Sequence, residues 1–278
     1  MRFLFIHGGP GFNSNPEKHL LTELFSQNGD ELLLWNEPSP QRSSGTNHVE
    51  FKDLCESLEK TITEVSKDGP VIVLAHSFGA LVLNQILPAI GERIAAIVLI
   101  SPATDLFSAD LKILEVSKKD LHGSAEAEVL AESIRTLKPG ANFSPLRQNA
   151  LMTAAGNANL TSHYWFKKTA MPSYYEYFNG PQYQFNLDSF FSIRNSCASD
   201  TIKQTTETPT AVIYGRHDFV VLPDEFDGLK KFYPNSSINI FEESGHYAHI
   251  EEPDKFLRLC KSLTNMSRVK LSEVTSRP

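Results

Sequence analysis

A serine, an aspartate and a histidine occupy positions in this chain that suit nucleophilic acyl transfer. Ser77 lies in the run 71–80, where an apolar strand pattern leads through Ala75-His76-Ser77-Phe78-Gly79 into a helical pattern. Strand, sharp turn and helix, with small residues two positions before and after the serine, are typical of a nucleophile elbow. Such a turn places the serine at a helix N-terminus, where partial positive charge favours a developing anion.

Two later strand patterns end in partners for this serine. Asp218 follows the apolar run 211–214 and the turn at Gly215, and His246 follows the run 238–241 and a short loop. A serine hydroxyl needs a base within hydrogen-bond reach and an acid that orients that base. The order Ser77, Asp218, His246 is the one expected of the α/β-hydrolase arrangement. The sequence therefore predicts a catalytic triad of these three residues.

Other interpretations of the same residues remain open at this point. His249 is an alternative base, although Gly245 gives His246 the sharper turn, and Asp105 is an alternative acid after the strand that ends at Ile100. Ser77 alone would also suit a simple helix N-cap. The His246-x-x-His249 spacing lacks a third ligand of suitable spacing, so we expect no metal and no other cofactor.

A glycine-rich turn follows the first strand pattern and reads His7-Gly8-Gly9-Pro10-Gly11. Acyl transfer builds negative charge on the carbonyl oxygen, which requires two backbone N–H donors already aimed at it. We expect one donor from Phe78, directly after the nucleophile. We expect the other from Gly9, which has no side chain to obstruct the approach.

The elements that must position these residues alternate along the chain. Short apolar runs predict six buried strands, at residues 3–6, 32–35, 71–75, 95–100, 211–214 and 238–241. Helical patterns fall between or after them, at residues 17–27, 49–66, 79–90, 224–232 and 254–266. Runs without polar alternation suit strands covered on both faces. The pattern predicts an α/β fold with a mostly parallel, doubly wound sheet and ligands beyond the strands' carboxyl ends.

The stretch between the fourth and fifth strands breaks this alternation. It contains helical patterns at 108–121, 124–137, 145–155 and 160–170, and eleven aromatic residues lie between Tyr164 and Phe191. We interpret it as a helical cap at 104–205, inserted into a core made of 1–103 and 206–278. Its aromatic side chains would form an apolar substrate pocket. The residues expected to contact substrate are Trp165, Tyr174, Tyr175 and Phe178. The polar segment from Ser267 onward is expected to be frayed.

Composition limits the classes of protein to consider. The chain has 278 residues, with 26 Lys and Arg against 33 Asp and Glu, so its formal net charge is −7. An acidic chain argues against a nucleic-acid partner, which would require a basic surface. The apolar run 3–6 is too short for a signal sequence or a membrane span. Three separated cysteines give no disulfide framework, so we expect a cytoplasmic protein with no membrane partner.

These motifs together resemble the α/β-hydrolase superfamily over nearly the whole chain. The resemblance rests on the turn 7–11, the elbow 75–79, the run 215–218, and Gly245-His246. It also includes Glu251-Glu252-Pro253, which precedes a helix as in the superfamily's C-terminal run. The resemblance implies a helical cap before the last two strands and the absence of the family's first two, antiparallel strands.

The turn at 7–11 is similar to that of proline iminopeptidases, which remove N-terminal proline from peptides. That family usually has Gly-Gly-Ser-Trp-Gly at the nucleophile and an Asp-Gln-Arg-Gly-type run after the next strand. This chain has Ala75-His76-Ser77-Phe78-Gly79 and the run 36–42 at those places. An aminopeptidase also needs cap carboxylates for a charged amine, and the aromatic part of the cap offers only Glu176 and Asp188.

The resulting hypothesis is a serine hydrolase that acts through an acyl-enzyme on a small-molecule acyl substrate. A carboxylesterase for small or medium acyl esters is the first expectation. A proline iminopeptidase-like aminopeptidase is the second. The third is a non-catalytic ligand-binding protein on a hydrolase scaffold, because fold alone does not determine function.

Overall fold

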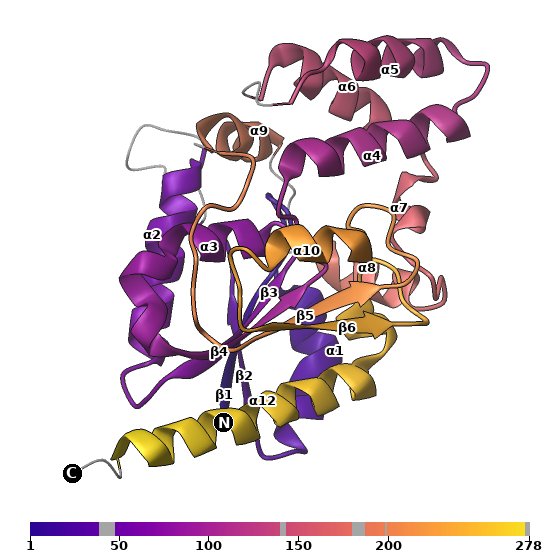
Figure 1. Ribbon diagram of the computed structural model, residues 1–278. Helices are drawn as coiled ribbons and strands as arrows, with labels where there is room; N and C mark the ends of the chain where they lie inside the picture. The colour runs from indigo at the N-terminus through magenta and orange to yellow at the C-terminus, as the bar shows by residue number, and fades with distance from the viewer. Residues whose placement is uncertain (39–47, 140–142, 180–186, 198, 276–278) are drawn as a thin grey trace.

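The computed structural model describes residues 1–38, 48–139, 143–179, 187–197 and 199–275. Within this part of the chain, six strands form one sheet in the order β2-β1-β3-β4-β5-β6, and every neighbouring pair is parallel. The strands are β1 (Arg2–Ile6), β2 (Glu31–Trp35), β3 (Val71–His76), β4 (Ile94–Ile100), β5 (Thr210–Gly215) and β6 (Ser236–Phe241). The α/β class, the parallel sheet and the six expected strands are confirmed (Figure 1).

Helices cover both faces of the sheet because alternate strand residues are apolar in both directions. In β1, Leu4 and Ile6 join one buried cluster while Phe3 and Phe5 join the other. The first cluster includes side chains of α2 (Phe51–Val65), α3 (Gly79–Ile90) and α10 (Phe226–Leu229). The second includes α1 (Asn15–Ser26) and α12 (Pro253–Thr275). Short helical segments also occur at Gly91–Arg93, Pro223–Glu225 and α11 (Ala248–Glu251).

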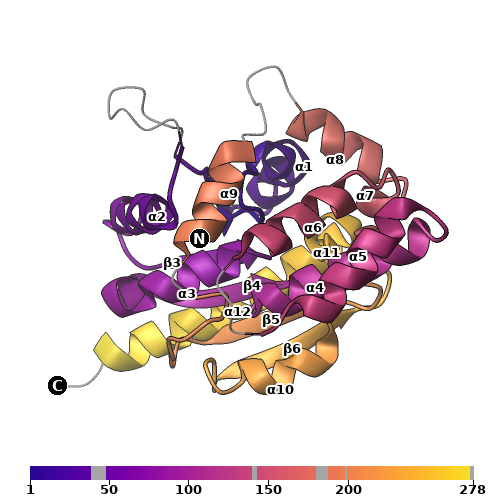
Figure 2. The ribbon, with the colours of Figure 1, turned by 90° about the horizontal axis from the view of Figure 1, so that it is seen from above.

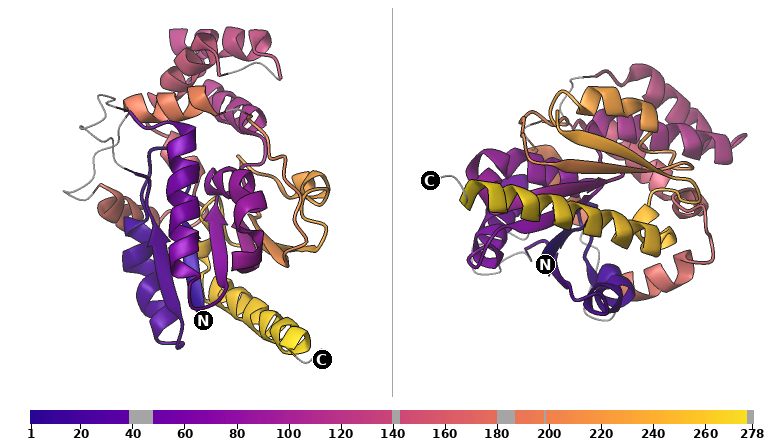
Figure 3. Two further views of the ribbon diagram at one scale, coloured as in Figure 1. Left: turned by 90° about the vertical axis from the view of Figure 1, so that its left-hand side faces the viewer. Right: turned by 60° about the horizontal axis from the view of Figure 1, so that its bottom comes forward.

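The chain between β4 and β5 is helical, as expected. It contains α4 (Leu106–Asp120), α5 (Ala125–Thr136), α6 (Pro145–Ala155), α7 (Leu160–His163), α8 (Met171–Phe178) and α9 (Leu187–Ser196). Figure 2 shows α4, α5 and α6 lying beside one another, and they share a buried apolar cluster. Figure 3 (left) places these helices at the opposite end of the molecule from α12. We refer to residues 106–196 as the insertion.

Two sequence expectations were wrong. The helix expected at 160–170 is only α7, and α8 does not begin until Met171. The intervening backbone is used elsewhere: the Phe166 and Lys167 N–H groups donate to the Glu251 carboxylate, so they are unavailable for helical hydrogen bonds. The expected fraying from Ser267 is also wrong, since α12 continues to Thr275. Residues 39–42, Tyr183 and Phe185 lie outside the described residues.

Candidate active site

The loops after β3, β5 and β6 bring Ser77, Asp218 and His246 together. Ser77 Oγ lies 3.0 Å from His246 Nε2, and His246 Nδ1 lies 2.8 Å from Asp218 Oδ2. Because an ionised carboxylate only accepts, Nδ1 carries the imidazole proton and Nε2 is free to accept from the serine hydroxyl. The arrangement is therefore the one that a nucleophile, a base and an orienting acid would need, in one hydrogen-bonded line between residues up to 169 positions apart in the sequence.

Ser77 occupies a strained turn, as the elbow motif predicts. Its φ is +50°, in the left-handed region that non-glycine residues rarely adopt. The first residue of α3, Gly79, lies against the backbone that follows β1. A Cβ on Gly79 would lie only 2.6 Å from the His7 carbonyl oxygen. The small residue two positions after the nucleophile is thus needed for the close approach of helix and strand.

Asp218 and His246 are fixed by backbone hydrogen bonds. The second carboxylate oxygen of Asp218 accepts from the Val220 and Val221 N–H groups at 2.8 and 3.1 Å. The His246 N–H donates to the Tyr164 carbonyl at 2.8 Å, which ties the base to the insertion. The first two bonds orient the Asp218 carboxylate, and the third holds the His246 backbone against the insertion.

The loop that carries His246 passes between two other backbone segments at contact distance. A Cβ on Gly215 would lie 1.9 Å from the Gly245 carbonyl oxygen, and a Cβ on Gly245 would lie 2.5 Å from the Tyr164 carbonyl oxygen. Glycine is therefore required at both positions for the end of β5, the His246 loop and the insertion to pack together.

The glycine-rich turn after β1 lies beside the nucleophile. Gly9 has a φ of +135°, a conformation available to glycine. Among the described residues, the backbone N–H groups of Gly9 and Phe78 have no hydrogen-bond acceptor, and both residues line the same cavity as Ser77. The two expected oxyanion donors are thus without an acceptor in the described ranges and lie on the same cavity wall as Ser77.

Glu37, which follows β2, and the buried His7 at the start of the turn hold this turn in place. The Gly11 N–H points at both carboxyl oxygens of Glu37, at 3.1 and 3.0 Å, and the Glu37 N–H donates to His7 Nε2 at 3.3 Å. Burial raises the pKa of Glu37 to about 8 and lowers the pKa of His7 to about 4. At neutral pH both side chains are therefore mostly uncharged: Glu37 is a protonated carboxyl group, and His7 Nε2 can accept this bond while its Nδ1–H donates to the Gly8 carbonyl.

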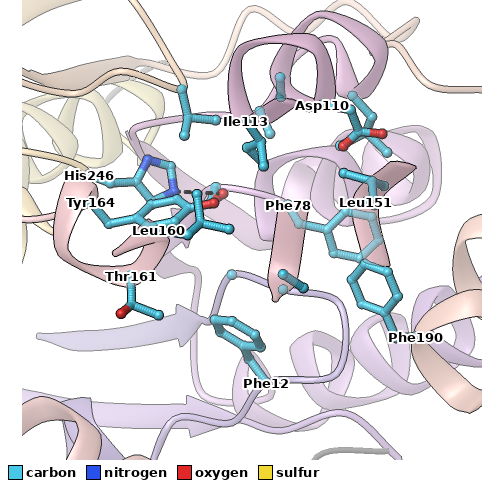
Figure 4. A pocket seen from close by; sticks show the side chains of 18 of the residues that line it. Phe12, Phe78, Asp110, Ile113, Leu151, Leu160, Thr161, Tyr164, Phe190 and His246 are labelled. Carbon is cyan, nitrogen blue, oxygen red and sulfur yellow. Dashed lines mark hydrogen bonds between the residues drawn. The ribbon is translucent and has the colours of Figure 1, made fainter. Parts of the chain in front are cut away.

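A cavity of about 420 Å³ opens above the triad (Figure 4). Helices α4, α6, α7, α8 and α9 all contribute to its wall, together with the loops that carry the triad. Most of the lining is apolar, with Phe12, Phe78, Ile113, Leu151, Phe178 and Phe190 as examples. The loops at the sheet edge thus place Ser77 and His246 on the cavity wall, and the insertion supplies most of the rest of the lining.

Comparison with known proteins identifies the family. A family model described as alpha/beta hydrolase fold matches residues 2–253 of the chain. The chain belongs to the α/β-hydrolase fold family. No sequence among the curated proteins matches this hydrolase.

Solved structures show the same fold at low sequence identity. A proline iminopeptidase-related protein from Thermus thermophilus aligns with a TM-score of 0.63 and 16% identity, over 94% of this chain and 88% of that one. An epoxide hydrolase from Bacillus megaterium gives 0.58 and 16%, over 95% and 93%. An esterase from Exiguobacterium antarcticum gives 0.55 and 14%, over 95% and 92%. At these identities the similarity establishes a shared fold.

The alternative acid and base have other partners in this hydrolase. Asp105 caps α4, where its carboxylate accepts from the Phe107 and Ser108 N–H groups at 2.9 and 3.2 Å. His249 is fully buried, with Nε2 3.3 Å from Glu17 Oε1. Neither is hydrogen-bonded to Ser77 or His246 in the part of the chain that the structure describes, so the geometry favours the triad predicted first.

The four aromatic residues expected to contact substrate divide into two pairs. Tyr175 and Phe178 line the cavity. Trp165 and Tyr174 are not among its lining residues and pack behind it in a buried cluster with Tyr247, where the Trp165 and Tyr247 rings stack with centroids 4.3 Å apart. A dense aromatic run signals a core or a pocket, but it carries no information about the direction of each ring.

One charged pair interrupts the apolar lining. Asp110 and Arg194 both line the cavity, and Arg194 Nη2 donates to Asp110 Oδ2 at 2.7 Å. Behind them Arg147, only 1% exposed, donates to the same Asp110 oxygen at 2.6 Å and also pairs with Asp200. The two arginines and two aspartates balance in charge, as buried ionic groups require.

Sequence reasoning missed Glu251 and Lys112, which connect the insertion to the triad loops. One Glu251 oxygen accepts from the Phe166 and Lys167 N–H groups at 2.8 and 2.6 Å, and the other accepts from Gly245 N–H at 2.7 Å. Lys112 on α4 donates to the Val220 carbonyl at 2.9 Å and pairs with Glu225. The only sequence signal for Glu251 was its place in the Glu251-Glu252-Pro253 run.

Metal-ligating clusters and membrane spans are both absent from the described residues. No group of three or more His, Cys, Asp or Glu side chains in these ranges could hold a metal ion. No helix in the same ranges is long and apolar enough to cross a membrane.

Proposed function

We propose that this hydrolase is a serine carboxylesterase that cleaves small or medium acyl esters through a covalent acyl-enzyme. The observation that carries the proposal is the line Ser77 Oγ–His246–Asp218, at 3.0 and 2.8 Å, on the wall of an apolar cavity. A serine hydroxyl bonded to a base, two N–H donors without an acceptor among the described residues, and an apolar pocket together meet the requirements of acyl transfer.

The reaction begins when the Ser77 hydroxyl attacks the ester carbonyl. His246 Nε2 takes the serine proton, and the Asp218 carboxylate stabilises the resulting imidazolium. The carbonyl oxygen becomes an oxyanion and accepts from the Phe78 and Gly9 N–H groups. The C–O bond to the alcohol then breaks, the alcohol oxygen takes the proton from His246, and an activated water later releases the acid from Ser77.

The charge in the cavity supports an ester over an aminoacyl substrate. A free amine would need an unpaired carboxylate, and the cavity carboxylate Asp110 is already bonded to two arginines. Glu176 and Asp188, the carboxylates in the aromatic part of the insertion, are not among the lining residues. An iminopeptidase-like activity is therefore the second candidate, and a non-catalytic binding role is the third.

The triad comes from the loops of the sheet and most of the cavity lining comes from the insertion, which supports the domain boundaries expected from the sequence. We propose that 104–205 acts as a substrate-specificity cap on a core made of 1–103 and 206–278. A cytoplasmic location is proposed as well, supported by Cys55, Cys197 and Cys260, all of which are free thiols.

A fluorophosphonate probe tests the nucleophile directly. We expect stoichiometric labelling of Ser77 in the wild type and none in Ser77→Ala. Acyl esters of graded chain length should be hydrolysed by the wild type only, and prolyl amides should not be cleaved. Absence of labelling and of ester turnover in folded protein would refute the proposal. Release of proline without ester turnover would support the iminopeptidase candidate, and tight ester binding unchanged in Ser77→Ala would support the binding role.

A further inference from the structure

Tyr164 is a cavity-lining side chain with no part in the mechanism above. It comes from the insertion, directly after α7, and its ring meets the His246 imidazole edge-on with centroids 5.4 Å apart. Phe219 packs against the same ring at 5.0 Å. Figure 4 shows Tyr164 and His246 together on one wall of the cavity. The insertion thus places a phenol beside the catalytic base.

The position of this residue is fixed by its backbone. The Tyr164 carbonyl accepts from the His246 N–H at 2.8 Å, so the two residues are hydrogen-bonded as well as in ring contact. Phe166 and Lys167, which follow shortly after it, are held by Glu251, which also holds Gly245. Tyr164 and His246 therefore keep one relative geometry, which is what preorganised catalysis needs.

The hydroxyl of Tyr164 is available to a substrate. No residue in the described part of the chain hydrogen-bonds to it. Burial raises the pKa of Tyr164 above its ordinary value of 10, and the neighbouring Tyr175, Asp218 and Asp110 add to that shift. Tyr164, His246 and Asp110 all line the same cavity, so the phenol and the imidazole face one shared space. With its pKa raised, the phenol keeps its proton and acts as a hydrogen-bond donor.

We propose that Tyr164 is a further catalytic residue, whose hydroxyl donates a hydrogen bond to the leaving-group oxygen as the ester bond breaks. This inference rests on the proposed esterase function. When the tetrahedral intermediate collapses, the electron pair of the C–O bond goes to the alcohol oxygen. The proton that this oxygen gains comes from His246 Nε2, and Tyr164 keeps its own proton throughout.

The leaving-group side is favoured over the oxyanion side by what surrounds the phenol. The carbonyl oxygen already has two backbone donors, from Phe78 and Gly9. Tyr164 instead packs on the imidazole of His246, the group that must face the leaving oxygen in order to protonate it. A donor held against that imidazole is placed to share the same oxygen.

Tyr164→Phe tests this with the removal of one atom that has no partner among the described residues, so the melting temperature should not fall. We expect kcat/KM for alkyl esters, whose leaving groups are poor, to fall about 10- to 100-fold, as for the loss of a bond to a charged oxygen. For p-nitrophenyl esters of the same acid, we expect less than about a threefold change, because that leaving group needs little stabilisation. The slope of log(kcat/KM) against leaving-group pKa should steepen accordingly.

Tyr175→Phe is the matched control. Tyr175 also lines the cavity, but its ring packs against Tyr174 and Phe178 of its own helix rather than against the His246 imidazole, so the two ester series should change equally. Equal losses for both ester series in Tyr164→Phe, or no loss in either, would overturn the role of Tyr164 alone, provided that the wild type labels at Ser77 and hydrolyses esters. A wild type that neither labels nor turns over would overturn the esterase function and this role with it.

Discussion

The carboxyl edge of the sheet and the insertion hold their functional groups in different ways. At the sheet edge, Ser77, Asp218 and His246 lie on short loops whose backbone is bonded to neighbouring strands or loops, as in the bond from Ser77 N–H to the Ile100 carbonyl. The insertion has its own small apolar cluster, and side-chain contacts such as those of Glu251 and Lys112 join it to the triad loops. Backbone hydrogen bonds thus position the proposed reacting groups, whereas the insertion is joined to the sheet by buried apolar side chains, such as Leu106 and Ile193 of the core cluster, as well as by these polar bonds.

The sheet edge should show the largest effect. We expect Asp218→Asn to lower kcat by about 10⁴-fold, because an asparagine NH₂ facing Nδ1 forces the imidazole proton onto Nε2, which can then no longer accept from Ser77. The fold should hold, since the asparagine oxygen can still accept from the Val220 and Val221 N–H groups. Steady-state ester hydrolysis measures this.

Asp224→Asn is the control for that experiment, with the same charge change a few residues along the loop. Asp224 lies in the segment Pro223–Glu225 and has no hydrogen bond to His246 in the described structure, so activity should stay near that of the wild type. A loss in Asp218→Asn no greater than in Asp224→Asn would show that the acid lies elsewhere.

Loss of a buried ion pair in the insertion should lower the stability of the protein. Arg147→Met leaves Asp200 without its nearest cation and Asp110 with one arginine, so we expect the free energy of unfolding to fall by about 3–5 kcal/mol. Urea denaturation followed by circular dichroism would measure it. Arg135→Met, which removes an exposed ion pair with Glu132 on the same insertion, should have no measurable effect. Equal stabilities for the two variants would mean that the buried ionic cluster does not hold the insertion together.

The junction between the two regions should give the smallest effect. In Glu251→Gln, the side-chain NH₂ must face a backbone N–H, so either the Gly245 bond or the Phe166 and Lys167 bonds are lost. We expect kcat to fall about 10-fold with little change in KM, since even a shift of about 1 Å in a catalytic group is costly. Steady-state kinetics on one ester would separate the two parameters.

Glu252 provides the comparison for this variant because it bonds to the same loop, through Ser244 Oγ and the Glu243 N–H, but not to the described part of the insertion. If Glu252→Gln lowers kcat as much as Glu251→Gln, the loss in both variants comes from weaker support of the loop that carries His246. The link between that loop and the insertion would then have no catalytic role.

The strands and the meeting of the triad residues were predictable because their signals are local. An apolar run such as 71–75 marks a buried strand, and parallel strands align their carboxyl ends, so Ser77, Asp218 and His246 had to meet at one edge. The glycine turn at 7–11 was recognisable for the same reason.

The insertion was less predictable because its structure depends on distant partners. Arg147 pairs with Asp110 and Asp200, and no pattern in the sequence links positions so far apart. The helix expected at 160–170 ends early because Glu251, more than 80 residues away, takes its N–H groups. Tyr164 could not be chosen from among eleven aromatics without knowing which rings face the cavity.

The close stacking of Gly215, Gly245 and the Tyr164 carbonyl limits how this scaffold can be re-engineered. A chimera that grafts a foreign lid onto this sheet must deliver a bare carbonyl to that spot, at the depth that the two glycines leave open. A donor lid whose backbone lies closer to Gly245 than the Tyr164 carbonyl does would collide with the main chain and displace His246. Such grafts should therefore be joined outside residues 164–167, with that tetrapeptide retained from the host.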